Sequence, residues 1–335
     1  MTVDLQNLEP FAPRRWLHGG HAQTIASYLI RRENHLPPGE KRFFQVTEDT
    51  QLLCECNWQA EKTRALTVII IHGLEGSSQS GYMLGTAAKA LAAGMNVVRM
   101  NMRNCGNTEQ LTPTLYHSGY SADLAAVVHQ LIREDHLTRI GLVGYSMGGN
   151  LVLNLVGEWG AAKPGEVLAS ATVSPVMDLA PSADALHNRS NRVYELKFVR
   201  GLARLFRRKA KLFPERYDVS RLQNIRSIRE FDEKITAPYG GFQDADDYYA
   251  RVSSARLADR IALPSLILYS ADDPFIRFLP ETCAKLRRNK SVIFCETARG
   301  GHCAYLAAPH GYDGRWAELT VIEFLKRFQK QVPRL

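Results

Sequence analysis

A serine between two glycines is the residue of this sequence best placed to do chemistry. Residues 144–148 read Gly-Tyr-Ser-Met-Gly, with Ser146 at the centre. An apolar run at 139–145 precedes the serine and a helical stretch at 147–158 follows it, which would place the hydroxyl on a sharp strand-to-helix turn. Only glycine tolerates cheaply the close approach of the two arms of such a turn. The pattern predicts a nucleophile, although a glycine-rich loop with a spectator serine would read the same.

The partners of Ser146 decide between these two interpretations, because a nucleophilic serine needs a base and the base needs an acid that orients it. A strand predicted at 265–269 runs into an Asp-Asp-Pro turn, in which we choose Asp273 as the acid and keep Asp272 as the alternative. A strand predicted at 291–295 leads into a loop where His302, the expected base, follows two glycines. Parallel strands would bring all three residues to one edge of a sheet.

Attack on an ester carbonyl puts negative charge on its oxygen, which two preorganised N–H groups must meet. We expect the backbone N–H of Met147 to be one donor and that of Leu74, in the loop after a strand at 66–71, to be the other. His72 is expected to organise this loop and not to be the base. Because His302 must be neutral to accept a proton, kcat/KM should rise with pH through a pKa of about 6.5.

Strands and helices alternate along most of the chain. A hairpin is predicted at 41–47 and 51–58, and the two cysteines at 54 and 56 on its second strand are expected to serve packing. Further strands are predicted at 66–71, 96–100, 139–145, 167–173, 265–269 and 291–295, and helices at 82–93, 119–134, 147–158 and 313–329. This alternation favours a mostly parallel sheet covered by helices on both faces.

Residues 178–250 interrupt the alternation. They contain no credible buried strand, and between Tyr194 and Lys211 apolar side chains are interleaved with arginine and lysine. We interpret 178–250 as a helical cap, 1–177 as the first part of the core and 251–335 as the second. The basic cap could contact a membrane surface or acidic ligands, and an ordinary solvated helix is the alternative.

Composition narrows the classes of function further. The 335 residues carry 42 Lys+Arg and 34 Asp+Glu, a net charge of +8, which suits either anionic partners or a solvated basic surface. Zinc-finger spacing, RNA-binding aromatic motifs and a helix-turn-helix pattern are absent from the sequence, so nucleic acid is not an expected partner. His18 and His21 lack a third ligand at metal-site spacing, and a structural or pocket-wall role is expected for them.

The location follows from the cysteines and the N-terminus. The six cysteines lack C-x-x-C or Cys/His ligand spacing, residues 1–10 do not read as a secretory leader, and no apolar run approaches the roughly 18 residues that span a bilayer. We therefore expect a cytoplasmic protein with reduced thiols.

Motifs outside the three candidate catalytic residues add a family resemblance that runs from about Gly20 to the C-terminus. They are His-Gly-Leu-Glu-Gly at 72–76, Asn-Met-Arg-Asn-Cys-Gly at 101–106, Tyr-His-Ser-Gly at 116–119, Gly-Tyr-Ser-Met-Gly-Gly-Asn at 144–150, Arg-Glu-Phe-Asp at 229–232, Asp-Ala-Asp-Asp-Tyr-Tyr at 244–249, Ala-Asp-Asp-Pro at 271–274 and Gly-Gly-His at 300–302. The chain resembles the α/β-hydrolase superfamily and, more narrowly, the AB hydrolase 4 family of esterases and abhydrolase-domain lipases.

This resemblance implies an α/β-hydrolase fold and hydrolysis of a small-molecule or lipid ester. It implies a Ser146–His302–Asp273 triad that acts through an acyl-enzyme intermediate, with no cofactor and no metal. Two alternatives remain at this point: an acyltransferase on the same fold, and a small-ligand binder without catalysis.

Overall fold

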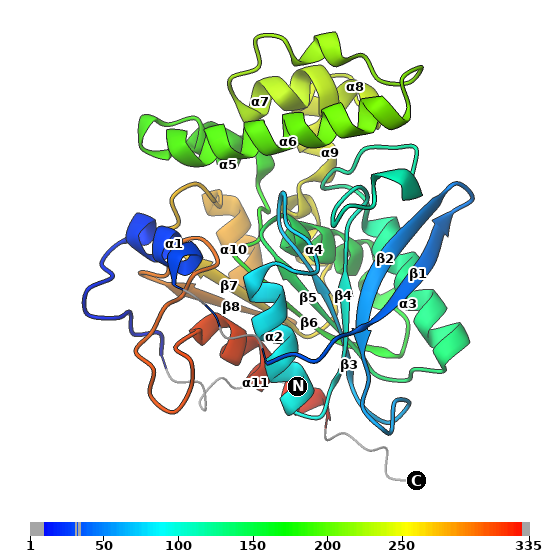
Figure 1. Ribbon diagram of the computed structural model, residues 1–335. Helices are drawn as coiled ribbons and strands as arrows, with labels where there is room; N and C mark the ends of the chain where they lie inside the picture. Colours follow the sequence, from blue (N-terminus) through cyan, green and yellow to red (C-terminus); the bar gives the residue numbers. More distant parts are fainter. Residues whose placement is uncertain (1–9, 31, 33–34, 330–335) are drawn as a thin grey trace.

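A single eight-stranded sheet organises the computed structural model, which describes residues 10–30, 32 and 35–329 (Figure 1). The strand order is β1-β2-β4-β3-β5-β6-β7-β8. The strands are β1 Glu40–Thr47, β2 Thr50–Asn57, β3 Thr67–Ile71, β4 Asn96–Met100, β5 Ile140–Tyr145, β6 Val167–Val173, β7 Ser265–Ser270 and β8 Val292–Thr297. The interpretation of residues 1–10 as lacking a leader lies outside the described residues except for the last.

The sheet confirms the predicted α/β-hydrolase architecture. β1 and β2 form an antiparallel hairpin, β2 is antiparallel to β4, and all other neighbours are parallel. Cys54 and Cys56 on β2 are both buried, as the prediction of a packing role requires. All six cysteines of the sequence lie in described segments, and all six are free thiols.

Strand β3 shows why the central strands read as continuous apolar runs. Every one of its residues is buried. Ile69 and Ile71 belong to one core cluster, together with side chains of α3 (Ser121–Asp135) and α4 (Met147–Trp159). Val68 and Ile70 belong to a second cluster with α2 (Gly81–Ala92) and α11 (Trp316–Gln329). Helices thus cover both faces of the sheet, and this leaves its strand ends as the place for a site.

Two helices were not predicted from the sequence. The first, α1, spans Gly20–Leu29, and the second, α10, spans Pro280–Arg288. Neither begins with a side-chain cap, and the first turn of α1 contains no acidic residue, so α1 lacks the usual signals of a helix start. Helix α10 does carry two of these signals, Pro280 at its first position and Glu281 in its first turn, and the sequence interpretation missed them. The last helix, expected from residue 313, begins at Trp316.

Five helices lie across the carboxyl ends of the strands, above the sheet in Figure 1. They are α5 Leu179–Leu186, α6 Arg192–Leu212, α7 Ile228–Phe231, α8 Ala237–Gly240 and α9 Ala245–Val252, and a π-helical turn at 232–236 joins α7 to α8. Residues 178–250, all of them described, contain helices and no strand, as expected for this segment. The division of the chain into 1–177, 178–250 and 251–335 stays a prediction about domains.

A buried lysine fastens the longest of these helices to the core. Lys209 on α6 is fully buried, and its ammonium donates hydrogen bonds to the backbone carbonyls of Glu109, at 2.7 Å, and of Thr112. The next residue toward the N-terminus, Arg208, forms an ion pair with the Glu109 carboxylate. These contacts attach α6 to the loop that follows β4.

Replacing Lys209 with methionine should lower the free energy of unfolding by about 1–3 kcal/mol, because two buried carbonyls lose their donor. Thermal unfolding would measure the loss. The matched control is Lys211→Met on the exposed side of the same helix, which should change stability by less than about 0.5 kcal/mol. Equal stability of the two variants would contradict the anchoring role.

Candidate active site

Ser146 occupies the strained turn that the sequence predicts. It lies between β5 and α4 with φ 54° and ψ −118°, in a region that a non-glycine residue rarely adopts. A Cβ on Gly144 would lie 2.4 Å from the carbonyl oxygen of Gly148. A Cβ on Gly148 would lie 2.4 Å from the carbonyl oxygen of His72, at the end of β3. Both glycines are thus required by close backbone approaches, one within the turn and one to the neighbouring strand.

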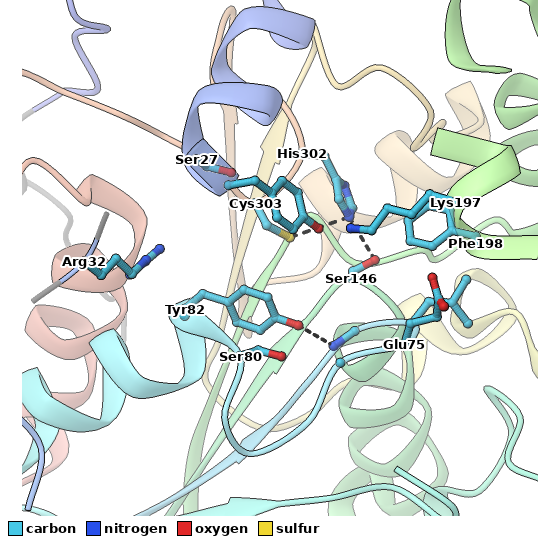
Figure 2. Close-up of a pocket in the computed structure, with 15 residues that line it drawn as sticks. Ser27, Arg32, Glu75, Ser80, Tyr82, Ser146, Lys197, Phe198, His302 and Cys303 are labelled. Carbon is cyan, nitrogen blue, oxygen red and sulfur yellow. Dashed lines mark hydrogen bonds between the residues drawn. The ribbon is translucent and has the colours of Figure 1, made fainter. Parts of the chain in front are cut away.

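The structure brings the three predicted catalytic side chains into one hydrogen-bonded chain. The Oγ atom of Ser146 lies 3.0 Å from Nε2 of His302, and Figure 2 marks this contact with a dashed line. Nδ1 of the same ring lies 2.8 Å from Oδ2 of Asp273, whose side chain is fully buried. The other carboxylate oxygen accepts N–H bonds from Phe275 at 3.1 Å and Ile276 at 2.9 Å. Asp273 is therefore held as an oriented acceptor for the imidazole.

Asp272, the alternative acid, has a different set of partners. Its Oδ1 accepts hydrogen bonds from the Ser270 hydroxyl at 2.5 Å and from the Gly301 N–H at 2.9 Å. These bonds hold the glycine loop that carries His302, and they leave the imidazole to Asp273. The two neighbouring aspartates thus have different contacts: Asp273 binds the His302 ring, and Asp272 binds the loop that carries His302.

Helix α1 supports the same loop from the other side. The hydroxyl of Thr24 accepts the backbone N–H of His302 at 2.8 Å, and it donates to the carbonyl of Gly20 at 2.7 Å. A Cβ on Gly20 would lie only 1.7 Å from the carbonyl oxygen of Asp272, so the helix sits directly against the Asp-Asp turn. Sequence reasoning missed this support, and the Gly-Gly pair before the helix was the one signal of a close approach.

The loop that follows β3 passes directly over Ser146. A Cβ on Gly73 would lie 3.0 Å from the Cβ of Ser146, and the N–H of Gly73 donates to the Tyr82 hydroxyl at 2.9 Å. Within the described residues, the next N–H, that of Leu74, and the N–H of Met147 at the start of α4 donate to no protein group. These are the two donors expected for an oxyanion.

His72 organises this loop, as expected. It is fully buried, its Nδ1 donates to the carbonyl of Gly73 at 2.8 Å, and its Nε2 accepts the N–H of Met102 at 3.1 Å. This pattern needs the neutral ring, and burial lowers the pKa of His72 to about 4. Both ring nitrogens are engaged away from Ser146, so His72 is not a base for the serine.

The Tyr-His-Ser-Gly motif at 116–119 connects three parts of the site. The Tyr116 hydroxyl accepts the N–H of Glu75 at 3.3 Å, in the loop over the nucleophile. The Ser118 hydroxyl accepts from Asn150 on α4 at 2.7 Å, and its N–H donates to the Tyr248 hydroxyl on α9 at 3.1 Å. The motif therefore connects the Gly73–Gly76 loop with helices α4 and α9. The sequence of the motif alone did not reveal this role.

The surroundings of His302 correct the expected pH dependence. Burial by itself lowers the pKa of the His302 ring, but its interactions with Cys303 and with the carboxylate of Asp273 raise this pKa by more, and the net result is a rise from 6.5 to about 10. Cys303 Sγ lies 3.8 Å from Nε2, on the same side of the ring as Ser146. The sequence analysis used the ordinary histidine pKa of about 6.5, because a sequence does not give the distances from the ring to Cys303 and Asp273.

A base must be neutral, so activity should be lost as pH falls through this raised pKa. We expect the midpoint of kcat/KM against pH to lie clearly above 6.5, after correction for spontaneous ester hydrolysis. Cys303→Ala should move the midpoint toward lower pH, since it removes one of the groups that raise the pKa. A profile that is flat from pH 6 to 9 would contradict His302 as the base.

The two aspartates should differ sharply when each is replaced with asparagine. Asp273→Asn should lower kcat by about 10⁴-fold, because the amide cannot stabilise an imidazolium. Asp272→Asn should mainly loosen the His302 loop, with a stability loss of about 1–3 kcal/mol and a much smaller effect on kcat. Steady-state kinetics and thermal unfolding of both variants would show this, and equal kcat losses would contradict it.

The side chains that could bind a metal ion, His18 and His21 among them, do not form a cluster in the described part of the chain. Across the described segments, no group of three or more His, Cys, Asp or Glu side chains could hold a metal ion. His21 stacks on Tyr194 of α6 with ring centroids 5.7 Å apart, and His18 contacts Arg299 at 3.0 Å. Both histidines thus have structural contacts, as expected. No helix in the described part of the chain is long and apolar enough to cross a membrane.

Comparison with known proteins identifies the family. A family model described as the alpha/beta hydrolase fold matches residues 67–309. The chain therefore belongs to the α/β-hydrolase family.

Curated relatives share most of its length. Putative esterase YheT of Escherichia coli (strain K12) is 30% identical over 324 residues, 95% of this chain and 93% of that protein. Phospholipase ABHD3 of Mus musculus is 30% identical over 307 residues, 89% of this chain and 74% of that protein. Monoacylglycerol lipase of Saccharomyces cerevisiae (strain ATCC 204508 / S288c) is 27% identical over 274 residues, 79% and 60% of the two chains. Within its family, the chain is a carboxylic ester hydrolase.

Solved structures share the fold at low identity. Esterase Pf2001 of Pyrococcus furiosus has a TM-score of 0.57 at 17% identity and covers 87% of this chain and 93% of its own. The 2,6-dihydroxy-pseudo-oxynicotine hydrolase has a TM-score of 0.57 at 15% identity and covers 94% and 74%. These likenesses concern the fold and leave the site to be argued from its own residues.

Proposed function

We propose that this protein hydrolyses carboxylic esters through a covalent acyl-serine formed on Ser146. One observation carries the proposal: the continuous chain of contacts from Ser146 to His302 to Asp273, with distances of 3.0 and 2.8 Å. A serine, a base and an orienting acid in this order are what nucleophilic catalysis by a hydroxyl requires.

The first half of the reaction forms the acyl-enzyme. Nε2 of His302 takes the proton of the Ser146 hydroxyl as Oγ bonds to the ester carbonyl carbon. The carbonyl oxygen becomes negative and accepts hydrogen bonds from the N–H groups of Leu74 and Met147. When the tetrahedral intermediate collapses, the bond from carbon to the alcohol oxygen breaks. His302 returns the proton to that oxygen, and the alcohol leaves.

The second half releases the acid. His302 takes a proton from a water molecule whose oxygen attacks the acyl carbon, and the Leu74 and Met147 N–H groups again hold the oxyanion. The bond to Oγ breaks, and the proton on His302 passes to Ser146. Asp273 remains a carboxylate throughout, because its task is to stabilise the imidazolium and fix the ring's tautomer.

Two alternatives keep the same fold. In an acyltransferase, an alcohol would replace water in the second half, and added alcohols would divert the acyl group into new esters. In a ligand binder without catalysis, Ser146 would be unreactive. The complete hydrogen-bonded chain and the unused N–H pair favour turnover over binding alone, since a binding role explains neither.

The substrates are small-molecule or lipid esters. The names of the relatives, a phospholipase and a monoacylglycerol lipase among them, support lipid esters as one class to test. Peripheral contact with a membrane surface stays a prediction. Exposed apolar side chains on α1 and α6 support it, namely Tyr28, Leu29, Val193 and Leu196.

Replacing Ser146 with alanine should reduce hydrolysis of p-nitrophenyl esters by about 10⁴-fold or more, because the acyl-enzyme cannot form. A fluorophosphonate probe should label the wild-type protein at Ser146 and leave this variant unlabelled. The control is Ser190→Ala at an exposed position in the cap, which should hydrolyse and label normally. Undiminished turnover by the Ser146 variant would overturn the mechanism.

A further inference from the structure

Two cavities of different character meet at Ser146. The first cavity, of about 280 Å³, is the more polar of the two and is called the polar cavity below; it is lined by His302 and by the charged side chains of Arg32, Glu75 and Lys197, and its wall also includes Leu74 and Phe198. Figure 2 shows these side chains around the nucleophile. The apolar cavity, of about 100 Å³, lies beneath the cap. Its wall includes Met147, Leu179, Leu186, Ile228 and Ile276.

The position of His302 decides which part of an ester enters which cavity. The leaving oxygen must receive its proton from Nε2 of this ring, so the alcohol has to lie on the side of Ser146 where the ring is exposed. His302 lines the polar cavity and not the apolar one, whereas Met147 lines the apolar cavity and not the polar one. The acyl chain would then occupy the apolar cavity, next to the Met147 N–H group that would bind the carbonyl oxygen.

The apolar cavity is small and partly open, so the part of an acyl chain that it encloses would be short. A cavity of about 150 Å³ is enough to hold benzene, whereas the apolar cavity has about 100 Å³. A further cavity of about 40 Å³ adjoins it and shares the walls Leu74 and Met147. Asp232 also lines both cavities, and its carboxylate accepts the Tyr249 hydroxyl at 2.7 Å. Even with both cavities filled, the space suits a short chain.

The polar cavity suits an alcohol that carries further polar groups. Glu75 lines this cavity, and within the described residues its Oε2 is buried without a hydrogen-bond partner. The ammonium of Lys197 lies 4.1 Å above the Tyr28 ring and supplies donors. The hydroxyls of Ser27 and Ser80 line the same space. A second hydrocarbon chain would leave these groups unpaired, at a cost in free energy.

We propose that the acyl chain binds in the apolar cavity and the alcohol in the polar cavity. The preferred substrates are then esters of short-chain acids, up to about six carbons by comparison with benzene, with alcohols that carry further hydroxyl or other polar groups. This inference rests on the proposed function, since it takes Ser146 as nucleophile and His302 as the acid toward the alcohol.

The acyl half is tested with p-nitrophenyl esters of two to twelve carbons. Wild-type kcat/KM should be highest at or below six carbons and should fall roughly tenfold or more by twelve. Leu186→Ala, which enlarges the apolar cavity, should move the optimum to longer chains. Ala183→Leu, which fills it, should move the optimum toward acetyl, so the test survives if either variant fails to fold. A wild-type optimum at ten carbons or more would overturn the proposal.

The alcohol half is tested with one acid on two alcohols, glyceryl butyrate and hexyl butyrate. Wild type should prefer the glyceryl ester, and Lys197→Met should reduce this preference roughly tenfold without moving the acyl optimum. Leu186→Ala should leave the preference unchanged. The reverse result, in which Leu186→Ala changes the alcohol preference and Lys197→Met the acyl optimum, would overturn the assignment of cavities.

Failure of this inference is distinguishable from failure of the proposed function. Hydrolysis that depends on Ser146 but prefers long chains or apolar alcohols would contradict the inference alone. Hydrolysis of all these esters that persists in Ser146→Ala would contradict both.

Discussion

The hydrogen bond between the imidazole of His302 and the carboxylate of Asp273 is the interaction on which the rest of the site depends. A buried carboxylate is costly unless it is paired and hydrogen-bonded. Here one oxygen meets the ring at 2.8 Å, and the other accepts two backbone N–H groups. This arrangement fixes the direction of the ring, and with it the nitrogen that faces Ser146. Together with Cys303 it also raises the pKa of His302, so this one contact contributes to both the orientation and the basicity of the ring.

Holding that contact in place takes more of the chain than the catalytic residues themselves. Asp272 binds the loop before His302, and Thr24 of α1 binds the backbone N–H of His302. On the opposite side, the loop over Ser146 is fixed by Tyr82 and Tyr116. The cap joins this network through Tyr248 and Ser118. The cap therefore shares its supports with the nucleophile's own helix, and it forms the roof of the apolar cavity from within the same framework.

The features predicted from sequence were those that depend on local patterns. The turn that carries Ser146 is marked by five consecutive residues, 144–148. Asp273 and His302 each follow a strand that the sequence predicts. Helix α1 was not predicted, because its role depends on fitting Gly20 against a turn more than 250 positions away in the sequence. The Tyr-His-Ser-Gly motif marked the family, but its contacts with Asn150 and Tyr248 appear only when the cap folds over the core. The pKa of His302 likewise depends on neighbours whose distances no pattern encodes.

The contact between Thr24 and His302 joins residues separated by 278 positions, so it bears on the order in which the protein is made. During synthesis the chain emerges from its N-terminus, and domains fold as their segments become available. A partly made chain that has reached β6 already contains Ser146 and the loop that would hold an oxyanion, but it has neither the acid nor the base. Ser146 is therefore synthesised before the two residues that we propose activate it. An incomplete chain that ends before β7 would lack the proposed acid and base, so by this mechanism its serine would not attack the esters around it.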